Sequence, residues 1–251
     1  MTNEYILKTA LRQSAVDLCC EPEDFLSSEP KVVISRASPG ARKYLKLPFV
    51  LELASYGSNI VASCSPELVG TAKSYIDRPD FYHCFETPAL HELGDELSRF
   101  GARVKYMAEY FLPDTAKLGE ALERSRCPYE TRLLTQPDFE PLYLPEWSNA
   151  LCKERSQLDM LGIAAYDRDR MVGFAACSAD CDSMWQIGID VLPGYRRQGI
   201  AKALVASLAC EIISRGKVPF YCAAWSNLRS VSCALSSGFR PSWVEVTACL
   251  I

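Results

Sequence analysis

Histidine is scarce in this sequence, and the cysteine spacings typical of a structural metal site are absent. The chain has two histidines, His83 and His91, and 12 cysteines. Structural zinc sites use paired Cys-x-x-Cys spacing, but the close pairs here are Cys19 with Cys20 and Cys177 with Cys181. We therefore expect no metal site. We also expect most cysteines to be reduced core residues, because a chain of this length folds without disulfide staples.

Long apolar runs and blocks of like charge are also missing. No stretch approaches the roughly 18 to 20 apolar residues of a membrane-spanning helix, and residues 1–20 lack the basic start and apolar core of a signal peptide. With 27 basic and 31 acidic residues the net charge is −4, and no basic block could follow a phosphate backbone. We expect a soluble, cytoplasmic protein that binds neither nucleic acid nor a membrane.

The chain does contain enough apolar residues for a substantial core. Hydrophobic residues make up 49% of the 251 positions, which fits one large domain or two small ones. A mostly polar stretch at residues 114–128 separates two halves with different patterns. We predict a smaller α/β domain at residues 1–125 and a second domain at residues 126–251.

The first half alternates short runs of branched residues with helical spacing, which is typical of an α/β arrangement. Ser65 is a suitable N-cap and Pro66 a suitable first helical residue for one of its helices. We predict helices at residues 2–19, 65–76 and 89–100, and strands at residues 31–35, 47–54, 59–64 and 104–110.

The second half has the clearer pattern. Trp185, Ile187, Ile189 and Val191 alternate with Gln186, Gly188 and Asp190, which predicts a strand with one deeply buried face. Residues 199–215 are apolar over most of a helix surface, so this helix must pack against a sheet. We predict strands at residues 131–134, 161–166, 171–178, 185–191, 218–225 and 243–250, helices at 199–215 and 226–236, a loosely helical stretch at 138–151 and a hairpin turn at 167–170.

A basic, glycine-containing turn lies between the strand at residues 185–191 and the helix at residues 199–215. The first amides of a helix lack intrahelical partners and the helix dipole adds partial positive charge, so this turn suits an anionic phosphate. Gly199 permits a close approach of the backbone, and Arg196, Arg197 and Lys202 add positive charge. The alternative is an ordinary strand-to-helix turn with a solvated basic rim.

The residues around this turn resemble the motif of the GNAT superfamily of N-acetyltransferases. Its hallmark is Gln or Arg, two residues, Gly, one residue, then Gly or Ala, and Arg196-x-x-Gly199-x-Ala201 fits it. Val191-x-Pro193-x-Tyr195-Arg196 matches the form common in the family. Asn227-x-x-Ser230, followed by Gly238-Phe239, matches further downstream. The resemblance covers residues 129–251.

The resemblance implies a mixed α/β fold with a central splayed sheet flanked by helices, and acetyl-CoA as acyl donor without a metal. The backbone of Ile189 and Val191 would pair with the pantetheine arm, an amide near Ile189 would polarise the thioester carbonyl, and the amides of Arg197 to Ala201 would hold the pyrophosphate. Asn227 and Ser230 would lie beside the arm. The cofactor-binding residues expected on this basis are Ile189, Val191, Arg196, Arg197, Gln198, Gly199, Ile200, Ala201, Lys202, Asn227 and Ser230.

The chain departs from the family at the positions that handle protons. Many members carry a tyrosine seven residues after the asparagine, where this chain has Ala234, and the position of a glutamate base is occupied by Trp185. Tyr221 could replace the acid but is more typical of a core residue. We interpret Asp190 as turn-stabilising or solvated, Asp180 and Asp182 as solvated, and Cys177 and Cys222 as structural, and we assign no catalytic base.

Three functions fit these residues. The leading one is an acetyl-CoA-dependent N-acetyltransferase that moves the acetyl group to a primary amine of a small molecule by direct attack on the thioester. The alternatives are a protein or peptide N-acetyltransferase and a non-catalytic acyl-CoA-binding regulatory module. Residues 65–76 and 97–102 loosely echo the second half, so the first half is either a degenerate GNAT-like repeat or an unrelated α/β cap. The acceptor and the oligomeric state are left open, because acceptor pockets are built from variable loops.

Overall fold

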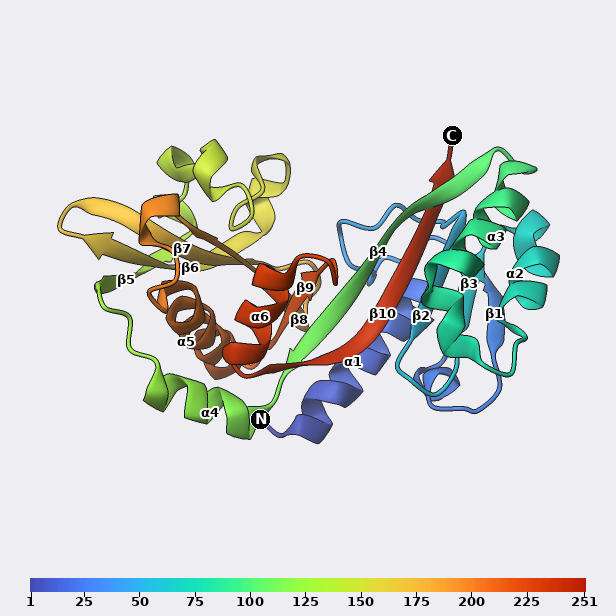
Figure 1. The fold of residues 1–251 in the computed structure, drawn as a ribbon, viewed down its shortest axis with the longest axis horizontal. Coiled ribbons are helices and arrows are strands. Elements are labelled where there is room, and N and C mark those ends of the chain that lie inside the picture. The colour runs from blue at the N-terminus through green and yellow to red at the C-terminus, as the bar shows by residue number, and fades with distance from the viewer. The chain divides into compact units, whose positions relative to one another are not determined.

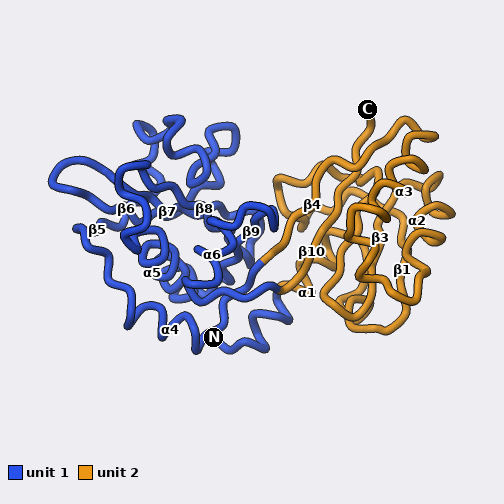
Figure 2. Tube along the Cα trace, in the orientation of Figure 1, with its two compact units in different colours: residues 1–9, 111–241 blue, residues 10–110, 242–251 orange.

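The computed structural model describes all 251 residues and divides them into two compact units, each built from separate segments of the chain (Figure 2). Unit 1 comprises Met1–Thr9 and Phe111–Pro241, and unit 2 comprises Ala10–Tyr110 and Ser242–Ile251. Helix α1 (Asn3–Leu18) and strands β4 (Ala102–Pro113) and β10 (Phe239–Leu250) contribute residues to both units. The domain boundary between residues 125 and 126 stays a prediction, as does the degenerate repeat.

Unit 1 contains a mixed sheet in the order β9-β8-β7-β6-β5 (Figure 1). Its strands are β5 (Glu130–Thr135), β6 (Asp159–Asp167), β7 (Arg170–Ser178), β8 (Met184–Val191) and β9 (Val218–Ala223). Strands β8 and β9 are parallel, whereas β5 to β8 pair antiparallel, and the predicted hairpin closes at Asp167↔Arg170. The mixed α/β class predicted from the sequence is confirmed.

Different parts of the chain pack against the two faces of this sheet. Along β6, Leu161, Ile163 and Ala165 pack into the cluster that contains Leu204 and Val205 of helix α5 (Ile200–Ser214), while Ala164 joins a second cluster on the opposite face. Helix α6 (Leu228–Ser236) contributes Val231 and Ala234 to the first cluster. The predicted helices at 199–215 and 226–236 are therefore present and pack against the sheet.

The opposite face is covered by a segment of short 3₁₀ turns rather than by the loosely helical stretch predicted at residues 138–151. The turns are Gln136–Asp138, Glu140–Leu142, Pro145–Trp147 and Lys153–Leu158. Prolines at the start of the first three favour separate turns over one helix. Phe139 and Trp147 anchor the segment, with ring centroids 5.9 and 6.2 Å from that of Phe174 on β7. We call residues 136–158 the cover segment.

The polar stretch predicted to separate the two halves contains helix α4 (Thr115–Arg124). Asp114 caps the helix by accepting hydrogen bonds from the amides of Ala116 and Lys117, at 3.1 and 3.2 Å. Leu118 and Ala121 are buried in the same cluster as α5, because residues three apart share a helix face. The charged residues of this stretch form the solvated face of an amphipathic helix.

Unit 2 is organised around strands β1 (Lys31–Ile34), β3 (Val61–Cys64), β2 (Leu51–Ser55) and β10, which neighbour each other in that order. Strand β1 is parallel to β3, and β2 is antiparallel to both β3 and β10. Leu51 and Leu53 pack with Leu93 and Leu97 of helix α3 (Thr87–Ser98), and helix α2 (Val69–Ile76) adds Ala72. The predicted helix at 65–76 begins with a 3₁₀ turn at Pro66–Leu68, and the Ser65 side chain makes no cap hydrogen bond.

A buried ionic cluster also holds unit 2 together. Arg42, which is 3% exposed, pairs with Asp17 and with Glu245, at 2.6 Å in the second case. The Trp243 indole N–H donates to the same Glu245 oxygen at 2.8 Å, and its ring stacks between those of Tyr56 and Tyr110. One guanidinium thus connects a helix, a loop and the last strand of the chain.

Candidate functional site

Strands β8 and β9 separate partway along their length. Their parallel register runs from Met184↔Val218 to Ile187↔Tyr221, whereas β8 continues to Val191 and β9 to Ala223. The splay that the sequence predicts is therefore present. It begins directly before Ile189.

The register of β8 with β7 determines which backbone groups of β8 face the splay. The Leu192 amide donates to the Val172 carbonyl at 3.0 Å, and Val191 lies opposite Gly173. In an antiparallel pair the bonded and non-bonded positions alternate, so the N–H and C=O groups of Ile189 and Val191 point away from β7. Both predicted residues therefore present backbone polar groups along the splayed edge.

The turn after β8 has two residues in the left-handed backbone region. Arg197 has φ 63° and Gly199 has φ 82°, and α5 starts immediately afterwards with the Ala203 amide donating to the Gly199 carbonyl at 3.1 Å. The amides of Ile200, Ala201 and Lys202 precede this bond and form the open end of the helix. A Cβ on Gly199 would meet no heavy atom within 4 Å, so the backbone angle, and not a close contact within the protein, explains the glycine.

Aromatic and polar side chains brace the turn. The Tyr195 hydroxyl donates to Asp167 at 2.9 Å, and the Tyr129 hydroxyl donates to the Gln198 side-chain carbonyl at 2.9 Å. The Arg196 Nε donates to the Val191 carbonyl at 3.0 Å. Of the predicted turn residues, Gln198 and Arg196 therefore stabilise the turn through their side chains, while the Arg197 side chain is exposed.

Asn227 and Ser230 lie at the start of α6, after β9. The Asn227 side-chain oxygen accepts from the Ser230 amide at 3.3 Å and caps the helix. The Ser230 hydroxyl lies 2.8 Å from the hydroxyl of Tyr221, which is 3% exposed. Burial raises the pKa of Tyr221 above its ordinary value, and Ala234 is fully buried. Tyr221 is thus a core residue with one hydroxyl partner.

Asp190 anchors the cover segment to β8. Its carboxylate accepts from the Asn149 amide at 2.9 Å, the Asn149 side chain at 2.6 Å and the Ala150 amide at 3.0 Å. The neighbouring Gly188 is packed so closely that a Cβ there would lie 1.9 Å from the Asn149 carbonyl oxygen. Of the two sequence interpretations of Asp190, the turn-stabilising one matches this geometry.

Two further aspartates hold the other end of the cover segment. Asp180 is fully buried and accepts from Arg155 at 3.2 Å and from Ser178 at 2.9 Å, so the prediction that it is solvated is wrong. Asp159 accepts from the Cys152 amide and the Tyr143 hydroxyl, at 3.2 and 3.1 Å. Burial raises the pKa of Asp159 to about 6. The sequence analysis did not identify Asp159, because a single acid at the start of a strand has no distinguishing pattern.

The cysteines fit structural roles. All 12 are free thiols. Burial raises the pKa of Cys177 to about 12, which disfavours the nucleophilic thiolate, and the half-buried Cys222 lies 3.5 Å from the Gln186 side-chain nitrogen. No group of three or more His, Cys, Asp or Glu side chains is arranged to hold a metal ion. None of the helices is both long and apolar enough to cross a membrane.

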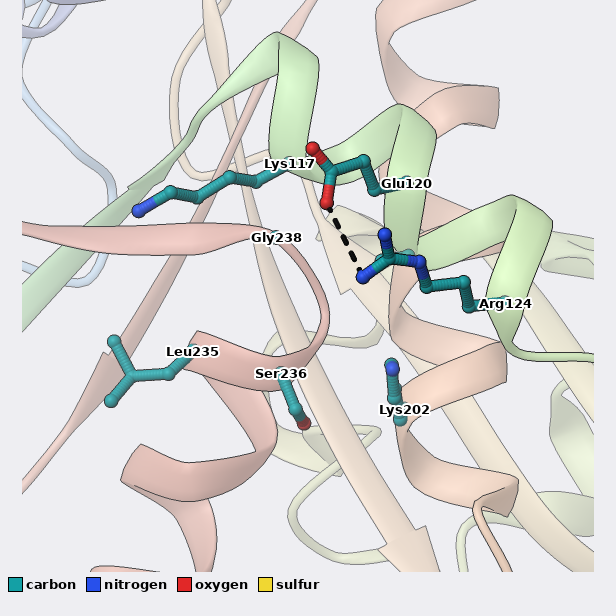
Figure 3. Close-up of a pocket in the computed structure, with 8 residues that line it drawn as sticks. Lys117, Glu120, Arg124, Lys202, Leu235, Ser236 and Gly238 are labelled. Carbon is teal, nitrogen blue, oxygen red and sulfur yellow. Dashed lines mark ion pairs between the residues drawn. The ribbon is translucent and has the colours of Figure 1, made fainter.

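A hollow of about 260 Å³ lies between α4, the first turn of α5 and the end of α6 (Figure 3). Three cationic side chains line it, together with one carboxylate. Arg124 and Glu120 form an ion pair at 3.6 Å. The lining residues are Lys117, Glu120, Ala121, Arg124, Lys202, Leu235, Ser236 and Gly238.

A parallel strand pair that splays beside a braced helix N-terminus defines unit 1 as a GNAT-type α/β fold. A sequence model described as GNAT acetyltransferase matches residues 88–243. This match covers more than half of the chain, and the chain belongs to the GNAT acetyltransferase family. It begins earlier than the resemblance at residues 129–251 and includes α3 and β4.

Solved structures with a similar fold share little sequence with this chain. A GCN5-related N-acetyltransferase-like protein from Streptococcus suis is 22% identical over 63% of this chain and 68% of its own, with a TM-score of 0.46. A GCN5-related N-acetyltransferase from Kribbella flavida is 15% identical over 64% and 63%, with a TM-score of 0.45. An aminoglycoside N-acetyltransferase in complex with CoA is 20% identical over 47% and 93%, with a TM-score of 0.37. No curated protein matches the chain.

Proposed function

We propose that unit 1 binds acetyl-CoA and transfers its acetyl group to a primary amine of a small molecule. The observation that carries this proposal is the open backbone edge of β8, which leads directly into the N-terminal turn of α5. The pantetheine arm contains amide groups, which can pair with the N–H and C=O groups of Ile189 and with the N–H of Val191 as an added strand would, while the Val191 carbonyl accepts from the Arg196 Nε. The pyrophosphate would then meet the open amides from Arg197 to Ala201.

The chemistry follows from this placement. The amine nitrogen attacks the thioester carbonyl carbon and forms the C–N bond, the C–S bond breaks, and CoA leaves as a thiolate that takes up a proton equivalent to the one the nitrogen releases. The Ile189 N–H faces the splay, where it can stabilise the developing oxyanion; removing one such donor from an enzyme costs roughly 3 to 4 kcal/mol. The Ser230 hydroxyl, paired with Tyr221 at 2.8 Å in the first turn of α6, is a proton-carrying group on the β9 side.

The cover segment favours a small acceptor over a protein. Asn149 is tied to Asp190 and its backbone lies directly against Gly188 of β8. This face of the strand is therefore already occupied by the chain's own backbone at that point. A compact amine needs less open surface than a folded protein does.

Calorimetric titration with acetyl-CoA tests the site. We expect the parent protein to bind and the Gly199→Glu variant to lose binding, because the substitution places a carboxylate among the phosphate-binding amides. Gly216→Glu is the matched control: Gly216 also has a positive φ, 75°, and open space around it, but it follows the other end of α5. Equal loss of binding in both variants, or no binding by the folded parent, contradicts the site.

An amine panel then separates the functions. CoA release with small amines supports the proposal, and acetylated peptides in a treated proteome favour the protein acetyltransferase instead. A thioester that stays intact with every acceptor, despite tight binding, indicates the acyl-CoA-binding module.

A further inference from the structure

The hollow between α4 and α5 has an excess of positive charge. Lys117, Arg124 and Lys202 line it with Glu120 as the one carboxylate. Arg124 forms an ion pair with Glu120, whereas the ammonium groups of Lys117 and Lys202 form no ion pair. Figure 3 shows Arg124 and Lys202 directed toward the same space from two different helices. Like charges facing one hollow repel each other, so an anion placed between them would be stabilised.

The position of these cations is set by packing. Leu118 and Ala121 bury one face of α4 in the core of unit 1, and a Cβ on Gly238 would lie 2.5 Å from the Leu118 Cα. The Ser237 hydroxyl donates to the Lys202 carbonyl at 3.3 Å. Arg124 therefore projects from an anchored helix, although its own side chain is 75% exposed. The cationic hollow is a feature of the folded unit and not of a free linker.

The hollow lies next to the turn assigned to the pyrophosphate. Lys202 directly follows Ala201, whose amide belongs to that turn, and successive helical residues are separated by about 1.5 Å along the axis. A ligand whose pyrophosphate occupies the turn would extend its remaining phosphate toward a nearby cationic surface. The hollow, at about 260 Å³, has room for one end of such a ligand and not for all of it.

We propose that Arg124 and Lys202 bind the 3′-phosphate of the donor CoA, so that α4 makes the protein selective for CoA thioesters over donors that lack this phosphate. The inference rests on the proposed function. A phosphate monoester dianion matches the two excess positive charges, and the arginine fork can donate two parallel hydrogen bonds to its oxygens.

The test compares acetyl-CoA with 3′-dephospho-acetyl-CoA by calorimetry. We expect the parent to bind acetyl-CoA at least about tenfold more tightly than 3′-dephospho-acetyl-CoA, since a hydrogen bond to a charged group contributes about 1.5 to 3 kcal/mol. Arg124→Gln should reduce this ratio at least threefold, and adding Lys202→Gln should bring it close to one. The affinity of the Arg124→Gln variant for the dephospho compound should stay unchanged.

Arg215→Gln is the matched control, because Arg215 is also a helix-end arginine that pairs with a glutamate four residues earlier, Glu211 at 2.6 Å. It should leave the ratio unchanged. Melting temperatures verify that each variant is folded.

Each other outcome has a definite meaning. This inference is overturned, and the proposed function left intact, if the parent binds both ligands with equal affinity. The same holds if Arg124→Gln lowers the affinity for both ligands by the same factor. Binding of neither ligand by the folded parent overturns both. Inorganic phosphate titrated alone should bind only weakly, in the millimolar range or above. If it binds in the micromolar range and acetyl-CoA does not displace it, the hollow is a free-phosphate site and the inference is wrong.

Discussion

At the scale of single residues, the carboxylates of unit 1 show how burial separates similar side chains. Asp182 is exposed, Asp180 is buried beside Arg155, and Asp159 is buried with a hydroxyl and an amide as donors. The sequence places all three near strand ends. Only their surroundings in the folded chain decide which of them are buried and what they contact.

Asp159 should make stability depend on pH. Its folded pKa of about 6 lies above the ordinary value of 3.8, so its contribution is fully present below pH 4 and is lost as the pH rises through 6. The Asp159→Asn variant has no carboxyl group to ionise at this position, so it does not lose this stability as the pH rises. Relative to the parent, the variant should gain up to about 2 to 3 kcal/mol of unfolding free energy between pH 4 and pH 7. Urea unfolding at several pH values measures this difference.

Asp182→Asn, on an exposed aspartate of the same unit, is the control and should follow the parent at every pH. A constant difference between Asp159→Asn and the parent across this range would contradict the assigned pKa.

At the scale of elements, the cover segment depends on a few polar anchors. Its 3₁₀ turns have little hydrogen bonding of their own, so the three hydrogen bonds that Asp190 accepts from Asn149 and Ala150 hold it on β8. The contact of Gly188 with Asn149 requires a glycine at that position. Together they explain how a segment without a long helix stays packed against β8.

Asp190→Ala should loosen this segment. We expect the unfolding free energy to fall by about 1 kcal/mol, because the Asn149 and Ala150 groups lose their acceptor in a partly exposed setting, and trypsin to cut faster after Lys153 and Arg155. Under the proposed function, in which this segment borders the acceptor site, the KM for the amine should rise more than the KM for acetyl-CoA. Asp182→Ala serves as the control, and unchanged proteolysis of Asp190→Ala would show that the anchors are dispensable.

At the scale of the whole molecule, neither unit is continuous along the chain. Strand β10 starts in unit 1 and supplies Val246 and Ala248 to the core of unit 2. Glu245 of the same strand meets Arg42 and, through it, Asp17 of α1. Unit 2 is therefore completed by residues from three distant parts of the sequence.

Arg42→Met should destabilise unit 2 strongly. It leaves Asp17 and Glu245 buried without a cation, and breaking a buried pair in this way costs about 3 to 5 kcal/mol. Urea unfolding followed by tryptophan fluorescence includes the signal of Trp243, which stacks on Tyr56 and Tyr110.

Arg78→Met is the control for that variant, since Arg78 forms a single surface pair with Glu92 at 2.8 Å. It should cost about 1 kcal/mol or less. Equal effects of the two substitutions would contradict the importance of the buried cluster.

The sequence by itself determined the elements that have a strong local pattern. Alternation predicts β8, helical spacing predicts α5, and the glycine and arginines between them predict the turn, because each depends on residues adjacent in the chain. The family resemblance added the splay beside Ile189, and the register of β8 with β7 agrees with the open edge at Ile189 and Val191.

Only the tertiary structure decided the features that join distant residues. Within the polar stretch at residues 114–128, Leu118 and Ala121 pack against α5, and residues 115–124 form α4. The pairing of Arg42 with Glu245, the burial of Asp180, and the convergence of Arg124 with Lys202 likewise have no local pattern. Periodicity reports which face of an element is buried, but the partner of that face depends on contacts between residues far apart in the chain.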